Sequence, residues 1–337
     1  MAGTFSLDIS EQYTRLAHLS KKKDKIEIHS LGYDNTIPNF FTNLVEKSAQ
    51  EQSKVISLLH NKLNIPSTSV HVVLPDDLSY SQLLLMPDLP EKELVKSIRL
   101  QADEFVPLPI GDVYVDLETI AKLPNGKLLI VFIAAQKKIV DHVHSTIEMA
   151  NLEPATLENE LSAVGRMVTE MFTFIKTPTL IINFGYGGTS LYVMNPPFPY
   201  FQITRTIRIG YDIILRDLKV NMNLGDAKAV EALRIIGLSA NGSINVNAII
   251  YPIINEFIAE IEKTILLTKE KYNVSISNIY LFNYDNHIGY LHETIQNKVS
   301  IPTQSLPLSS VLVPNTITQT FSNILSSFIP VIATHVR

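Results

Sequence analysis

The chain has 337 residues, of which 46% are hydrophobic and 18% are charged, and it carries a formal net charge of −5 without any cysteine. This length and hydrophobic content predict two domains or one large bilobed one, and they exclude an intrinsically disordered chain. The charge balance argues against a nucleic-acid partner, and the lack of cysteine excludes disulfides and thiolate metal sites.

The N-terminal sequence gives no sign of export or membrane insertion. It lacks a positively charged start followed by a long apolar core, so we expect no signal peptide. The longest apolar run, residues 128–135, is far too short to span a bilayer. We therefore expect a cytoplasmic protein whose membrane contacts are made only through a partner.

The N-terminal part of the chain is predicted to hold three short strands, a helix and a buried strand. Apolar and polar residues alternate over 5–9, 16–18 and 26–28, as half-buried strands require. Residues 42–63 contain no glycine or proline and space their apolar side chains as a helix does. Residues 70–74 are a short apolar run typical of a buried strand.

The stretch from Met86 to Asp116 has the most distinctive pattern in the sequence. A helix is predicted to begin near Pro90, because the fixed φ of proline suits the first helical position. Its core face is formed by Leu94, Ile98, Ala102 and Phe105 at helical spacing. Pro107 ends the helix, and alternation resumes at Val113. A strand, a helix and a second strand therefore follow one another closely here.

The rest of the chain divides into two similar series of elements. Before residue 178 we predict strands over 113–123 and 127–134, a helix over 136–150, and a strand followed by a helix within 156–174. After it we predict strands over 179–184, 190–194, 200–208 and 276–282, with helices over 211–222, 226–236, 249–271, 290–299 and 316–331. Both halves begin with three antiparallel strands followed by helix, which indicates two related α/β halves.

The run MPDLPEKELVKSIRLQADEFVPLPIGDVYVD, from Met86 to Asp116, resembles a segment that recurs in the PilM family of type IV pilus assembly proteins. The resemblance extends over nearly the whole chain. It implies a bilobed actin-like α/β fold with duplicated, ribonuclease H-like halves and a small inserted α+β subdomain. It assigns 1–78 and 151–177 to the first lobe, 79–150 to the insert and 178–337 to the second lobe.

The resemblance also implies where a nucleotide would bind. Actin-like proteins hold ATP between two glycine-bearing hairpins, where the missing side chain lets backbone N–H groups approach the phosphates. The first hairpin corresponds to Asp8, Ser10 and Arg15. The second half contributes Asn183, Gly185, Gly187, Gly188, Thr189, Gly210, Glu231, Arg234 and Tyr284.

Several of these positions depart from the family pattern. Ser10 replaces a glycine, Glu11 brings a carboxylate beside the phosphates, and Asn183 replaces an aspartate that would orient hydrated magnesium. A Gly-Gly pair keeps only Gly210, and a glycine turn under the adenine is missing around Tyr284. We therefore expect a degenerate nucleotide site without catalysis, in which the Gly185 turn is kept as part of the fold. Weak binding of ATP and magnesium is the alternative.

As partner, the resemblance implies a single-span membrane protein of the PilN type, whose cytoplasmic N-terminal tail binds extended in a groove between the insert and the first lobe. The groove residues that we expect are Leu94, Phe105, Val106, Pro109 and Ile110. Packing in a core is the alternative for each, above all for Leu94 and Phe105, because apolar helical residues usually face a core. Self-association is left open.

The predicted function is thus a cytoplasmic scaffold of a type IV pilus or related secretion machine. The alternative is a nucleotide-binding ATPase of the FtsA or sugar-kinase branch. A kinase would need intact phosphate loops, and FtsA-type proteins usually end in an amphipathic membrane helix, for which residues 321–331 carry too little charge. The cytoplasmic half of a type II secretion protein would continue into a transmembrane segment.

Two other patterns involve residue types that can carry chemistry. Asp116 and Glu118 share one face of a predicted strand, which we interpret as a solvated sheet face rather than an acid/base pair. The histidines lack the spacing of metal ligands, so no metal site is expected.

Overall fold

Two compact units divide the chain in the computed structural model, which describes residues 3–101, 106, 108–239 and 245–336. Unit 1 comprises Met1–Met171 together with Pro330–Arg337, and unit 2 comprises Phe172–Ile329. The C-terminal residues therefore belong to unit 1, whereas the sequence placed them in the second lobe. Each unit is built on a five-stranded sheet, and unit 1 carries a further three-stranded sheet.

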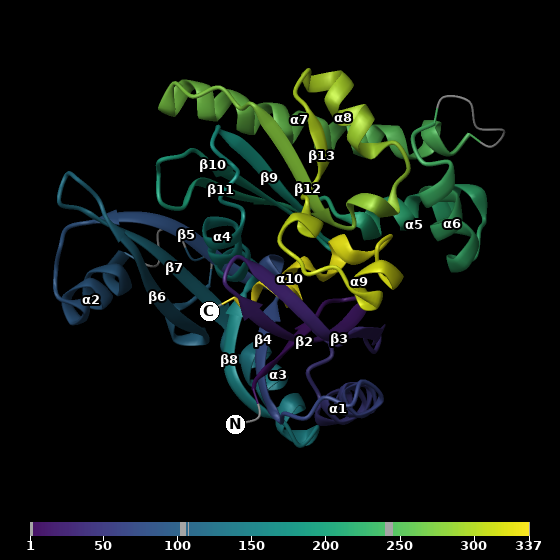
Figure 1. Cartoon of the computed structure of the whole chain (residues 1–337), viewed down its shortest axis with the longest axis horizontal. Coiled ribbons are helices and arrows are strands. Elements are labelled where there is room, and N and C mark those ends of the chain that lie inside the picture. Colours follow the sequence, from purple (N-terminus) through teal and green to yellow (C-terminus); the bar gives the residue numbers. More distant parts are fainter. Residues whose placement is uncertain (1–2, 102–105, 107, 240–244, 337) are drawn as a thin grey trace. The chain divides into compact units, whose positions relative to one another are not determined.

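The main sheet of unit 1 has the strand order β3-β2-β1-β4-β8 (Figure 1). Its strands are β1 Phe5–Ile9, β2 Tyr13–Lys22, β3 Lys25–Asn35, β4 Ser69–Leu74 and β8 Glu153–Asn159. β1 pairs antiparallel with β2 and parallel with β4, and β4 pairs parallel with β8. Strand β8 is thus an edge strand, and its outer edge takes no part in the sheet.

Two helices supply the rest of the unit 1 core. Helices α1 (Glu46–Lys62) and α3 (Lys137–Met149) pack together and against the main sheet. Ile139, Val143 and Ile147 of α3 join the buried cluster that contains Phe5 and Leu7 of β1. The sequence placed α3 within the insert, but its apolar stripe is buried in the core of the first lobe. Helix α4 (Glu160–Met171) follows β8 directly.

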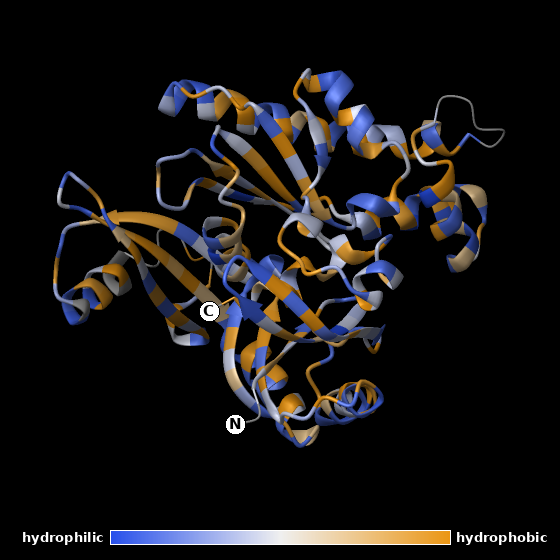
Figure 2. Cartoon of the chain, viewed as in Figure 1, coloured by the Kyte–Doolittle hydropathy of each residue, from blue (hydrophilic) through white to orange (hydrophobic). Residues whose placement is uncertain are grey.

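The insert is a three-stranded antiparallel sheet with the order β5-β7-β6. Its strands are β5 Ser79–Met86, β6 Val113–Lys122 and β7 Leu128–Gln136, with η1 Asp76–Leu78 before β5 and η3 Ile110–Asp112 before β6. Helix α2 (Glu91–Gln101) contributes Leu94 and Ile98 to the apolar clusters on one face of this sheet. Figure 2 shows β5 and β7 as largely hydrophobic, and β7 is buried from Leu128 to Phe132.

Unit 2 repeats the pattern of the first unit with the strand order β11-β10-β9-β12-β13. Its strands are β9 Thr179–Phe184, β10 Thr189–Met194, β11 Phe201–Ile207, β12 Asn278–Asn283 and β13 Thr303–Ser305. Its helices include α5 Tyr211–Met222, α6 Asp226–Ile235, α7 Val246–Tyr272 and α8 Leu291–Val299, with η4 Asp285–His287 after β12. The short strand β13 was not expected from the sequence, because three residues carry too little alternation to detect.

The predicted closing helix over 316–331 is wrong. The structure has three short pieces there, α9 Thr316–Thr320, η6 Leu325–Phe328 and α10 Ile329–Ala333. A capping box at Asn315 starts α9, but serine and asparagine predominate in the next turn, and these residues compete with helix by bonding the backbone locally. Pro330 then lies in the first turn of α10, where its missing N–H costs no hydrogen bond.

Candidate functional site

A pocket of about 510 Å³ lies in unit 1 between β6 of the insert and β8 of the main sheet. Residues of β6, β7, β8 and α4 line it, and its apolar lining includes Ile133 and Ala135 of β7 and Leu157 of β8. Strands β6 and β8 are both edge strands of their sheets. The pocket therefore offers apolar surface beside two strand edges.

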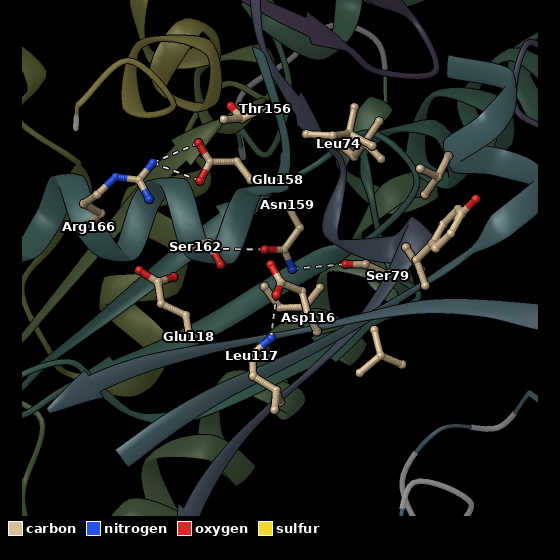
Figure 3. Close-up of a pocket in the computed structure, with 16 residues that line it drawn as sticks. Leu74, Ser79, Asp116, Leu117, Glu118, Thr156, Glu158, Asn159, Ser162 and Arg166 are labelled. Carbon is tan, nitrogen blue, oxygen red and sulfur yellow. Dashed lines mark hydrogen bonds and ion pairs between the residues drawn. The ribbon is translucent and has the colours of Figure 1, made fainter. Parts of the chain in front are cut away.

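Strand alternation decides which side chains of the insert face this pocket. Tyr114, Asp116 and Glu118 are exposed at alternate positions of β6, and all three line the pocket. Asp116 pairs across the sheet with Ile133, and cross-strand partners lie on the same face. Figure 3 shows Asp116 and Glu118 pointing toward the residues of β8 and α4, while Leu117 points the other way.

Asn159 at the end of β8 joins the two sheets of unit 1. Its side-chain amide donates to Ser79 Oγ at 3.1 Å and to Ser81 Oγ at 2.6 Å, both on β5. The side-chain oxygen of Asn159, Oδ1, accepts a hydrogen bond from the backbone N–H of Ser162 in the first turn of α4. This buried amide therefore fixes β5 and α4 beside the pocket.

The charged wall of the pocket is a pair between β8 and α4. Arg166 donates from Nη2 to both carboxylate oxygens of Glu158, at 2.8 and 2.9 Å (Figure 3). The same guanidinium donates from Nε to the carbonyl of Val336, and the hydroxyl of Thr334 donates to Glu158. The C-terminal residues are thus bonded to two residues that line the pocket.

The residues that the sequence indicated for a groove lie elsewhere. Leu94 is 4% exposed and packs with Leu128 and Ile130, and Val106 is 3% exposed and packs with Phe132. Ile110 is partly buried against the same cluster, Pro109 is exposed, and Phe105 lies outside the described residues. These packed residues lie on the α2 face of the insert sheet, opposite the pocket face, and Pro109 does not line the pocket.

In the first hairpin Asp8 and Arg15 bond each other. They are directly opposed in the β1–β2 ladder, both are at most 2% exposed, and Arg15 Nη1 lies 2.7 Å from Asp8 Oδ2. Burial raises the pKa of Asp8, and the guanidinium of Arg15 opposes that shift. Ser10 joins the pair, accepting from Arg15 at 3.3 Å and donating to the carbonyl of Tyr13 at 2.9 Å.

Other carboxyl groups gather near this hairpin. Burial, together with the charge and a hydrogen bond of the neighbouring Asp77, raises the pKa of Glu11 to about 8. Burial also raises the pKa of Glu160, with added repulsion from Asp76 and Asp8. Glu160 accepts from the backbone N–H of Asp76, and Asp76 accepts from the backbone N–H of Leu161. The environment of the first hairpin is therefore acidic.

The Gly185 turn of unit 2 is closely packed. A Cβ on Gly185 would lie 2.5 Å from the carbonyl oxygen of Gly188, and one on Gly210 would lie 2.2 Å from that of Tyr186. Thr189 Oγ1 donates to the carbonyl of Ile209 at 2.6 Å. Glycine is thus required at both places by neighbouring backbone, whether or not an anion binds there.

Aromatic side chains surround this turn. The rings of Tyr211 and Tyr284 stack 5.1 Å apart at 21°, and Tyr186 lies 5.7 Å from Tyr284. His287 lies 4.8 Å from Tyr284. Tyr211 and Tyr284 are at most 1% exposed. The structure therefore brings Gly185, Gly187, Gly188, Thr189, Gly210 and Tyr284 together, with buried phenol rings among them.

The other positions expected to contact a nucleotide are more scattered. Asn183 is buried on β9 and accepts from the side-chain amide of Asn283 at 3.0 Å. Glu231 and Arg234 are exposed on α6. Asp8, Ser10 and Arg15 belong to unit 1 and the remaining positions to unit 2.

The described part of the chain has neither a membrane-spanning helix nor a metal-binding cluster. None of its helices is long and apolar enough to cross a bilayer. Within the same residues, no group of three or more histidine and acidic side chains is placed to hold a metal ion.

A comparison with protein families decides the relationship. The model of the family "Type IV pilus assembly protein PilM" matches residues 6–316. The chain belongs to the PilM family. A solved structure of a PilM-PilN type IV pilus biogenesis complex is similar to this PilM-family chain with a TM-score of 0.83 at 17% identity, covering 98% of this chain and 97% of that one.

Other solved structures place the PilM-family chain in the actin-like fold. MreB 5 of Spiroplasma citri bound to AMPPNP matches with a TM-score of 0.51 at 10% identity, over 98% of this chain and 94% of that one. A protein of unknown function with an actin-like ATPase fold from Bacteroides thetaiotaomicron matches at 0.52 and 8% identity, over 95% of both chains. The predicted bilobed actin-like fold class is confirmed.

The sequence did not indicate the pocket of this PilM-family chain. It placed Asp116 and Glu118 on one strand face, but that face was interpreted as solvated and the residues opposite it were not identified. The signal for the other wall was the polar run Glu158-Asn159-Glu160, where β8 ends and α4 begins. In α/β folds, ligands commonly bind beyond the carboxyl ends of strands, where polar residues of this kind are found.

Proposed function

We propose that this protein is a cytoplasmic scaffold of a type IV pilus or related secretion assembly platform, and that its pocket between β6 and β8 binds the cytoplasmic N-terminal tail of a PilN-like membrane protein. Membership of the PilM family supports a role in type IV pilus assembly. The similar structure of a PilM-PilN complex supports a PilN-like protein as the partner. In this proposal the chain meets the inner membrane only through that partner.

The pocket suits an extended peptide for two physical reasons. Two edge strands, β6 and β8, border it, and an edge strand offers backbone groups to a further strand. Side chains of Ile133, Ala135 and Leu157 give the apolar contacts that alternate residues of a strand would fill. This pairing of backbone and pockets is the single observation that carries the proposal.

The proposed groove lies between the insert and the first lobe, the place that the resemblance implied, but other residues line it. Leu94 and Val106 stabilise the insert from its α2 face, where they are buried. In our proposal they support β6 and β7 from behind, and the pocket residues contact the tail. Pro109 has no role in it, and Phe105 lies outside the described residues.

We further propose that the protein works without bound nucleotide. To bind Mg-ATP, Asp8 would have to orient hydrated magnesium and Arg15 would have to contact phosphate. Instead the two side chains form an ion pair with each other, at 2.7 Å. Buried Tyr211 and Tyr284 occupy positions at which the family carries glycines for close approach of the nucleotide. The residues present therefore do not fit Mg-ATP. Isothermal titration with Mg-ATP should show no binding, and measurable affinity with turnover would favour the ATPase alternative.

The partner site is tested with a synthetic peptide of the cytoplasmic N-terminal tail of the PilN-like protein from the same organism. Fluorescence anisotropy should show binding to the wild-type protein. Ala135→Arg should abolish it, because the long side chain would fill the pocket. Leu58→Arg is the matched control, since Leu58 is 69% exposed on α1 and does not line the pocket. Equal binding to both variants would overturn the proposed site.

A further inference from the structure

We infer that Asp116 and Glu118 select a basic residue, arginine or lysine, in the tail that occupies the pocket. The inference rests on the proposed function, because it concerns the same site. It goes beyond it by naming the chemistry of the occupant. It is based on the net negative charge of the residues that line the pocket and on the exposure of the Asp116 and Glu118 carboxylates on one face of β6.

The pocket has an excess of negative charge. Among the described residues that line it, the charged ones are Asp116, Glu118, Glu158 and Arg166. Arg166 donates two hydrogen bonds to Glu158, at 2.8 and 2.9 Å, and a further one to the carbonyl of Val336. The pair Glu158–Arg166 is therefore neutral, and the carboxylates of Asp116 and Glu118 leave the lining with a net charge of −2.

Asp116 and Glu118 have room for an outside partner. Within the described part of the chain, no cation forms an ion pair with either carboxylate, and Asp116 bonds only the adjacent backbone N–H of Leu117, at 2.9 Å. Both side chains are exposed and point across the pocket toward β8 and α4 (Figure 3). They are two residues apart on a strand, so roughly 6.8 Å separates their positions on one face.

A peptide bound in the pocket must compensate the negative charges of Asp116 and Glu118. A peptide that fills the pocket removes water from Asp116 and Glu118, and a carboxylate that loses water without gaining a partner is strongly disfavoured. A basic side chain replaces that water with a charge-assisted hydrogen bond, and the planar fork of arginine can bond a carboxylate with two N–H groups. An acidic side chain would meet two like charges. The pocket thus binds neutral tails more weakly than basic ones and disfavours acidic tails most.

The test uses the same labelled tail peptide and its variants in which each arginine or lysine is replaced by glutamine. We expect the neutral peptide to bind about three- to tenfold more weakly to the wild-type protein at low salt, the range of exposed and partly desolvated charge pairs. The double variant Asp116→Asn/Glu118→Gln should bind both peptides equally. Added salt should narrow the wild-type difference, because salt screens exposed charges.

Matched controls separate this inference from general effects of charge. Asp112→Asn and Glu153→Gln remove the same groups from exposed positions outside the lining, and they should leave the preference for the basic peptide intact. Asp116→Lys should reverse the preference in favour of a peptide carrying glutamate. Thermal unfolding monitored by circular dichroism checks that each variant is folded.

The outcomes distinguish the two proposals. Binding of the wild-type tail that is unaffected by its basic residues, or a tail that binds without any arginine or lysine, would overturn this inference while leaving the proposed function standing. Failure of the wild-type protein to bind any tail peptide would overturn both.

Discussion

The single residue Arg15 forms a buried ion pair with Asp8 in the first hairpin of unit 1. Its guanidinium lies 2.7 Å from Asp8 in a site where both side chains are 2% exposed. A buried pair of this kind contributes little net stability compared with apolar residues of the same shape, but loss of one partner leaves a buried charge uncompensated. The first hairpin of unit 1 is thereby closed by its own side chains.

The energetic role of this pair can be measured with a double-mutant cycle. Arg15→Met should lower the free energy of unfolding by about 3–5 kcal/mol, because Asp8 remains buried without its cation. The double variant Arg15→Met/Asp8→Leu should recover most of that loss. Urea unfolding followed by circular dichroism measures both. Additive losses in the double variant would contradict the interpretation, since they would mean that the pair does not interact.

The pH dependence of stability is set in part by Glu11. Its pKa is raised from 4.5 to about 8 in the folded protein, so the folded state holds the proton that the unfolded state loses. The resulting stabilisation is complete below pH 4.5 and is lost as the pH rises from 4.5 to about 8. Glu11→Gln removes the titration, and its stability relative to wild type should increase over that range and then level off.

Urea unfolding at several pH values from 4.5 to 9 measures this relative stability. Glu153→Gln, at an exposed position on β8, provides the control and should show no such trend. A difference between Glu11→Gln and wild type that stays constant with pH would show that Glu11 titrates alike in the folded and unfolded states.

At the scale of elements, the two faces of β7 have different roles: one packs against α2 and the other lines the pocket. Phe132 is 1% exposed in the cluster beneath α2, whereas its neighbour Ile133 is partly exposed and lines the pocket. Successive side chains of a strand point to opposite faces. One strand therefore holds the insert together and forms part of the proposed tail site.

Substitution of these neighbours by alanine should give opposite results. Phe132→Ala should lower the free energy of unfolding by about 3–5 kcal/mol, the usual cost of removing a buried phenylalanine. Ile133→Ala should change stability less and weaken binding of the tail peptide. Urea unfolding and fluorescence anisotropy measure the two effects. Unchanged peptide affinity in Ile133→Ala would place the tail away from this face.

At the scale of the whole molecule, the chain returns to unit 1 after building unit 2. Thr334 and Val336 are at most 1% exposed, and they bond Glu158 and Arg166 beside the pocket. Burial also lowers the pKa of His335 to about 4, so this histidine is neutral at physiological pH. The end of the chain thus stabilises the β8 and α4 wall of the pocket.

Deletion of the chain from Thr334 onward tests this role. We expect a loss of about 3 kcal/mol in the free energy of unfolding of unit 1, because a buried valine and the hydrogen bonds of Glu158 and Arg166 are removed. Faster amide hydrogen exchange in β8 and α4 should accompany it. Thr334→Val, which removes only one hydroxyl, should have a smaller effect. Unchanged exchange in both elements would show that the segment does not support the pocket.

The sequence by itself determined most elements and the family. Periodicity of 2 or 3.6 depends on neighbours along the chain, so α5 and β9 were predicted with their observed bounds, and the motif from Met86 to Asp116 indicated the PilM family. It could not resolve the broken segment after Thr316, where weak helix formers and a proline leave local preferences balanced.

Only the tertiary structure decided which faces and edges meet. The alternation of β6 placed Asp116 and Glu118 together, but nothing in the sequence showed that β8 would lie opposite them, because sheet order depends on contacts between distant segments. The same limit applied to Leu94 and Val106, whose apolar character suits a groove or a core equally well. Their burial under the insert sheet, and the open pocket on its other face, follow from which side of β7 the helix α2 covers.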